Sequence, residues 1–132
     1  MIDSSIALAW SLPDESNPFA RQTLTQVIED GAHVPPLFAL EFGNALVMAV
    51  RRGRIDHAYR RRTFERVAEL NLTTDREGGD QLWTDTIELA DLHGLTLYDG
   101  VYLELSLRTG LRLATLDKRL ANAASARGVL HS

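Results

Sequence analysis

The sequence predicts an α/β domain in which a mostly parallel sheet is flanked by helices. Short apolar segments that read as strands are separated by one or two longer segments of helical periodicity, an order typical of parallel sheets. No Asn-Gly hairpin turn joins these segments. Hydrophobic residues make up 45% of the 132 residues and charged residues 24%, which excludes a disordered tail. We therefore expect a single domain over residues 1–132, built on one core.

The expected strands are short apolar segments bounded by polar, glycine or proline residues. The first is stubby, since only Met1 and Ile2 precede Asp3. The others cover residues 32–34, 71–74, 111–115 and 128–130. The segment 71–74 reads as an edge strand. Because helices lie between the strands, we expect parallel pairing.

Apolar residues recur at helical spacing in seven segments, which begin at capping residues or end at glycines. These segments cover residues 4–12, 17–30, 37–52, 54–70, 77–93, 96–109 and 118–126. In the second, the stripe expected to face inward includes Ile28. The third has apolar residues around nearly its whole circumference, Leu40 among them, and is expected to be buried on most sides. In the fifth, we expect Trp83, Ile87 and Ala90 to face inward.

Three acidic residues lie at expected helix starts. Asp99 follows Thr96 by three residues, a spacing typical of a helix cap, and Asp3 and Asp117 each precede a helical segment. Capping alone would explain all three. However, Asp3 and Asp117 also follow apolar strands, and the carboxyl ends of parallel strands open onto a common crevice. The pattern therefore also predicts that these acids face each other.

Glu41 lies within the most apolar helical segment, where a solvated carboxylate is not expected. It should therefore be paired with an arginine, protonated, or close to a metal ion. Asn44 lies one turn further along, and we interpret it as a polar neighbour that orients the Glu41 carboxylate or a water molecule.

A cluster of Asp3, Glu41, Asp99 and Asp117 would need a cation, because two carboxylates 4 Å apart repel by about 4 kcal/mol at an effective dielectric of 20. The chain has no cysteine, and its four histidines lack zinc-type spacing. Oxygen ligands alone favour Mg²⁺ or Mn²⁺. Acid clusters that hold such ions commonly serve phosphodiester hydrolysis.

The net charge of -4 argues against general phosphate binding, so any nucleic-acid contact should be local. Arg51, Arg52 and Arg54 are the candidates, together with residues 60–62; a solvated helix face is the alternative for each. No apolar run is long enough to cross a bilayer and no secretory signal is visible. We therefore expect a cytoplasmic protein with no membrane partner.

Four segments in a fixed order carry a family resemblance. They are residues 3–10 (DSSIALAW), 41–46 (EFGNAL), 97–102 (LYDGVY) and 113–117 (LATLD). With these segments the chain, from Asp3 to Val129, resembles a PIN-domain ribonuclease of the VapC toxin type. The resemblance implies a three-layer α/β/α fold in which Asp3, Glu41, Asp99 and Asp117 surround Mg²⁺ or Mn²⁺.

The resemblance also assigns roles within this set. It implies that Asp3 and Asp99 ligate the metal, that Glu41 and Asp117 complete the shell or hold water, and that Ser5 and Thr115 bond to the acids. The implied activity is cleavage of single-stranded or loop RNA with water as the nucleophile. The implied partners are a second copy in a homodimer and a small antitoxin whose tail lies across the active-site groove.

Two other classes of protein remain open on the sequence. A response-regulator phosphoacceptor domain would need an acid pair after the first strand and a lysine at the end of the last, but Ser4 and Ser5 follow Asp3 and the only lysine, Lys118, adjoins Asp117. A catalytically silent module that binds RNA or a partner is the second alternative. Metal-dependent cleavage separates the nuclease from both.

Overall fold

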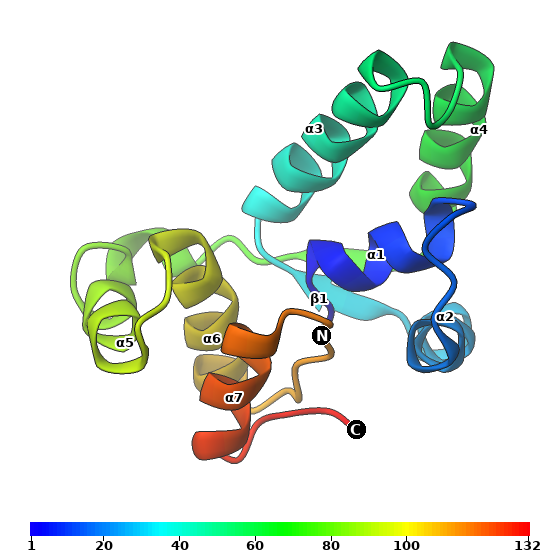
Figure 1. The fold of residues 1–132 in the computed structure, drawn as a ribbon. Helices are drawn as coiled ribbons and strands as arrows, with labels where there is room; N and C mark the ends of the chain where they lie inside the picture. Colours follow the sequence, from blue (N-terminus) through cyan, green and yellow to red (C-terminus); the bar gives the residue numbers. More distant parts are fainter.

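The computed structural model describes residues 1–132 and has a short parallel sheet at its centre (Figure 1). The two regular strands, β1 (Ala32–Val34) and β2 (Leu72–Thr74), pair in parallel with Ala32 opposite Leu72. β2 pairs only with β1, as expected of an edge strand. The predicted α/β class and its parallel pairing are confirmed.

The remaining expected strands are reduced to single parallel bridges. Ile2 bridges to Ala114, and Leu113 bridges to Leu130. The backbone N–H of Ile2 also donates to the carbonyl of His33 in β1, at 3.4 Å. Five segments thus lie side by side, with the stubby N-terminal segment between β1 and the segment around Ala114. This places Asp3 near the middle of the sheet.

Helices flank this sheet. They are α1 (Ser4–Ser11), α2 (Pro18–Asp30), α3 (Leu37–Arg51), α4 (His57–Ala68), the 3₁₀ turn η1 (Gly78–Gln81), α5 (Asp85–His93), α6 (Leu97–Thr109) and α7 (Lys118–Ala126). Figure 1 shows α5, α6 and α7 gathered on one side of the strands, and α2, α3 and α4 on the other. No helix is long and apolar enough to cross a membrane.

The helix starts follow the capping chemistry read from the sequence. Side-chain oxygens of Asp3, Asn17, Thr96 and Asp117 each accept a hydrogen bond from the backbone N–H three residues on. Asp56 does the same for α4, so that helix begins at residue 57 instead of 54. Each such cap contributes about 1 kcal/mol.

The expected helix over residues 77–93 is confirmed only over its second half, and its start is wrong. The structure has η1 followed by α5 instead, because Gly78 and Gly79 have low helix propensity. The Asp75 carboxylate also accepts the N–H of Gly78 at 2.9 Å, which stabilises a turn there. As a result Trp83 is 82% exposed and Ile87 is 38% exposed, whereas Ala90 is buried as expected.

The expectation that the helix over residues 37–52 is buried on most sides is also wrong. Only one face of α3 is buried, and Leu40 is 74% exposed. Figure 1 shows the reason, since α3 runs outward from the sheet and has α4 as its neighbour along one side. Ile28 on α2 was also expected to face inward, but it is 65% exposed. Apolar composition alone does not reveal which faces find a partner.

Candidate functional site

Two of the four predicted acids follow neighbouring parallel segments at the carboxyl edge of the sheet. Asp3 follows Ile2, whose bridge partner is Ala114, and Asp117 lies three residues beyond that partner. Glu41 reaches this edge from α3, and Asp99 reaches it from the first turn of α6. Four elements far apart in the sequence therefore supply the acids.

Asp3 is the most buried of the four acids, at 4% exposure. Its Oδ1 accepts hydrogen bonds from the Ser5 hydroxyl at 2.6 Å and from the Ile6 N–H at 3.2 Å. Its Oδ2 accepts the Thr115 hydroxyl at 2.5 Å. The Thr115 oxygen in turn accepts the N–H of Asp117 at 3.0 Å. This network fixes the Asp3 carboxylate and links it to the segment that carries Asp117.

Glu41 is half-buried and is hydrogen-bonded by hydroxyl groups, with no arginine as partner. Its Oε1 accepts the Tyr102 hydroxyl at 2.5 Å and the Ser4 hydroxyl at 3.4 Å. Burial and the neighbouring Glu41 charge raise the pKa of Tyr102, so this phenol stays a hydrogen-bond donor. Oε2 of Glu41 receives no hydrogen bond from the protein and remains free to bind a ligand or water.

The charges of the four acids act on one another around a closed ring. Burial raises the pKa of Asp3, and the charge of Asp117 adds to this. Burial also raises the pKa of Glu41, with added effects of Asp99 and Asp3. The pKa of Asp99 is raised by burial and by Asp117. The charge of each acid therefore acts on two others of the set.

None of the four acids takes part in any of the six ion pairs of the structure. Oxygen donors that repel one another and form no ion pair fit a hard divalent ion in chemistry and in charge. However, no three of these side chains are arranged so that they could hold a metal ion without rearrangement. The carboxylates of Asp3 and Asp117 cap their own helices, and Glu41 is bonded to Tyr102.

Of the three residues predicted to support the acids, two bond to Asp3 and one bonds to none of the acids. Ser5 and Thr115 both bond to Asp3, as described above. Asn44, by contrast, is exposed and makes no side-chain hydrogen bond, so nothing joins it to Glu41.

The predicted RNA-binding arginines do not border the acids. Arg51 and Arg52 are exposed at the end of α3, ten residues from Glu41 along the helix, which corresponds to about 15 Å. Arg54 is held in ion pairs with Asp14 at 2.7 Å and Glu15 at 2.8 Å.

The structure adds Tyr102 and Arg119 to the site, which the sequence did not single out for these roles. Tyr102 lies three residues after Asp99, on a helix where that spacing places both on one side. The Arg119 guanidinium, near the start of α7, lowers the pKa of Asp99 and so opposes the other shifts. The spacing could have indicated Tyr102, but only the tertiary structure shows that it reaches Glu41.

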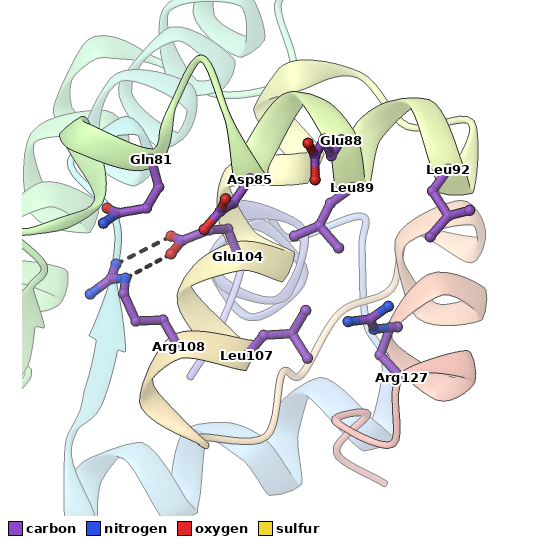
Figure 2. Close-up of a pocket in the computed structure, with 9 residues that line it drawn as sticks. All are labelled: Gln81, Asp85, Glu88, Leu89, Leu92, Glu104, Leu107, Arg108 and Arg127. Carbon is purple, nitrogen blue, oxygen red and sulfur yellow. Dashed lines mark hydrogen bonds and ion pairs between the residues drawn. The ribbon is translucent and has the colours of Figure 1, made fainter.

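The largest cavity, of about 530 Å³, lies away from the acid ring between α5 and α6. Figure 2 shows Glu104 and Arg108 pointing toward each other inside it, with Arg127 at the opposite end. Arg108 also bonds to Asp75 at 2.7 Å. Because this guanidinium is occupied by two carboxylates, we interpret the cavity as part of the structural framework.

The raised pKa values predict a stability that depends on pH. An acid whose pKa is higher in the folded protein makes folding less favourable as pH rises through that value. The pKa values of Asp3, Glu41 and Asp99 all lie above their ordinary values of 3.8 and 4.5. With chelator present, we expect the Tm to rise as the pH is lowered from neutral toward the raised pKa values of these acids. We expect Mg²⁺ or Mn²⁺ to remove this slope, because cations favour the ionised acids.

The experiment is best made in a His131→Gln variant. Burial lowers the pKa of His131, and this gives the opposite dependence, since stability is then lost as the pH falls below about 6.5. Thermal melts at several pH values, with chelator or with metal, measure the slope. A Tm of the chelated variant that falls steadily on acidification would contradict the prediction.

The comparisons with known proteins agree with this architecture. Residues 1–126 match the family model described as PIN domain, and the chain belongs to the PIN-domain family. It is similar to the Ribonuclease VapC3 of Pyrobaculum aerophilum, with 30% identity over 121 residues that cover 92% of this chain and 91% of the relative. The resemblance to VapC-type PIN domains is thereby confirmed.

A solved structure supports the fold independently. The crystal structure of PAE2754 from Pyrobaculum aerophilum superimposes with a TM-score of 0.68 and 24% sequence identity, and the match covers 92% of this chain and 82% of that one. At this identity the likeness concerns the fold alone.

Proposed function

We propose that this protein is a metal-dependent endoribonuclease that hydrolyses single-stranded or loop RNA and acts as the toxin of a toxin–antitoxin pair. The observation that carries this proposal is the set of four acids whose charges act on one another, none of them in an ion pair. The similarity to a relative named as a VapC ribonuclease supports the same activity.

In this proposal Asp3 and Asp99 hold Mg²⁺ or Mn²⁺, and Glu41 and Asp117 complete the site. A divalent ion there would supply positive charge to a phosphodiester as negative charge develops on its oxygens. Asp3 suits this task because its hydrogen bonds with Ser5 and Thr115 leave the carboxylate little freedom. Preorganised charge of this kind costs little rearrangement during the reaction.

Glu41 is the residue that we assign to the attacking water. Tyr102 and Ser4 bond to Oε1, which orients the carboxylate and leaves Oε2 as an acceptor for a water proton. The raised pKa of Glu41 makes it a better base than an exposed glutamate. Arg119, beside Asp99, is placed to contact the RNA phosphate.

The remaining predicted contacts are also part of the proposal. Arg51 and Arg52 are free to bind RNA phosphates further along the strand, whereas Arg54 is occupied by Asp14 and Glu15. By the family likeness we further propose a cytoplasmic homodimer that is inhibited by a cognate antitoxin. A short reading frame next to the gene, encoding a DNA-binding segment, would support the antitoxin assignment.

Cleavage of labelled, structured RNA tests the activity. We expect cuts with Mn²⁺ or Mg²⁺ and none with chelator. Because water is the proposed nucleophile, a 2′-deoxy substitution at the cleaved nucleotide should leave cleavage intact. A product with a 2′,3′-cyclic phosphate would instead show attack by the ribose hydroxyl. Absence of metal-dependent cutting would favour a silent binding module.

A further inference from the structure

A second cavity, of about 450 Å³, lies at the same edge of the sheet as the acid ring. It is bounded by the start of α3, the start of α6 and the segment that follows β2. Its walls include Pro36, Leu40, Leu82, Tyr98 and Val101. Most of this lining is apolar, unlike the cavity between α5 and α6.

Two residues that line the cavity directly precede acids of the candidate active site in the sequence. Leu40 directly precedes Glu41, and Tyr98 directly precedes Asp99. Both β1 and β2 end at this edge, and the residues that follow them line the cavity. We infer from this proximity in the chain that an RNA strand bound at the acids extends toward the cavity.

The lining has the chemistry of a nucleobase site. Tyr98 is 61% exposed and Leu40 is 74% exposed, so an aromatic ring and an aliphatic side chain offer free faces to a flat ligand. RNA-binding proteins stack unpaired bases on such aromatic side chains. Asp75 and Glu104 also line the cavity, but both carboxylates are bonded to Arg108 and are largely buried.

We propose that this cavity binds one nucleobase of the RNA next to the cleaved phosphate, by stacking on Tyr98. The proposal rests on the proposed function, since it deepens the substrate recognition of the same site. We favour an RNA base as the occupant, because the cavity lies beside the proposed site of cleavage. The alternative occupant is an apolar side chain of a protein partner, and the test must exclude it.

Binding in a non-cleaving background tests the proposal. Fluorescein-labelled heptaadenylate, heptacytidylate and heptauridylate are titrated with Asp99→Asn and with the double variant that adds Tyr98→Ala, and the anisotropy is recorded. We expect Asp99→Asn to bind all three. Loss of Tyr98 should weaken their binding about tenfold. Tyr98→Phe should retain it.

Trp83→Ala in the Asp99→Asn background is the matched control, because Trp83 is also an exposed aromatic residue, at 82%, and does not line this cavity. It should leave all three affinities unchanged. Because Tyr98 is exposed, its removal should not unfold the protein, and circular dichroism checks this. An abasic heptamer should bind equally with and without Tyr98.

The two proposals fail separately. If wild-type protein cuts no RNA but Asp99→Asn shows binding that depends on Tyr98 and on the base, the nuclease proposal fails and the base site stands. If affinities are the same with and without Tyr98, the base site is overturned, whatever the cleavage assay shows. A protein partner would then be the better occupant.

Discussion

Asp99→Asn is expected to reduce metal-dependent RNA cleavage by at least about 100-fold and to raise the Tm of the metal-free protein by a few degrees. The loss of activity follows from the proposed metal role of Asp99, because electrostatic stabilisation by a bound ion contributes several kcal/mol. The gain in stability follows from the raised pKa of Asp99, since burial and Asp117 disfavour its charge.

An opposing effect must be weighed in this prediction. Asp99 lies in the first turn of α6, where a negative charge is favoured by about 0.3–1 kcal/mol through the helix dipole. Burial and the charge of Asp117 act in the opposite direction and raise the pKa of Asp99, and we expect these two effects to be the larger ones. Asp85→Asn is the matched control, as an exposed first-turn acid of α5, and should lower the Tm slightly with no change in activity.

Cleavage rates and thermal melts with chelator measure both effects on the same preparations. A lower Tm for Asp99→Asn than for wild type would show that Asp99 serves mainly the helix start. Full activity of this variant would remove Asp99 from the catalytic group.

Arg108→Met is expected to lower the free energy of unfolding by about 3–5 kcal/mol, because it leaves two carboxylates without their cation. The guanidinium bonds to Glu104 at 2.7 Å and to Asp75 at 2.7 Å. These carboxylate side chains are only 7% and 11% exposed. The same guanidinium holds the pKa of Asp75 below its ordinary value, so the pair favours the folded state at neutral pH.

Arg61→Met is the matched control for this substitution. Arg61 also forms an ion pair at a separation of four residues, with Glu65 at 3.9 Å, but both side chains are mostly exposed, at 72% and 65%. Such pairs contribute little, so the loss should stay below about 0.5 kcal/mol. Urea unfolding of both variants measures the difference.

A compensating variant separates the cost of unpaired charge from the loss of packing. Adding Glu104→Gln and Asp75→Asn to Arg108→Met removes both buried charges and should restore much of the stability. If Arg108→Met alone unfolds with the stability of wild type, the ion network is not part of the framework.

The candidate acids could be predicted because a charged residue in an apolar segment can be recognised from the sequence alone. Asp3 and Asp117 follow apolar strand segments, and Glu41 interrupts an apolar helix, so each stands out against its neighbours. Their capping role was also visible and is confirmed, since Asp3 caps α1 and Asp117 caps α7.

The burial of whole faces could not be predicted in the same way. Leu40, Ile28 and Trp83 are apolar and lie at helical spacing, yet each is largely exposed. Burial requires a packing partner, and the direction in which α3 leaves the sheet decides whether Leu40 has one. The distance of Arg51 and Arg52 from the acids could not be predicted either. These arginines lie at the end of α3, and the length of this helix separates them from Glu41.

The sequence by itself determined the class of fold, the helix caps and the identity of the four acids, because these depend on local periodicity and on the chemistry of single residues. Only the tertiary structure decided what each acid contacts. Tyr102 reaches Glu41 from 61 residues away, and Thr115 reaches Asp3 from 112 residues away. Contacts across such separations depend on how helices pack on the sheet, which no local pattern specifies.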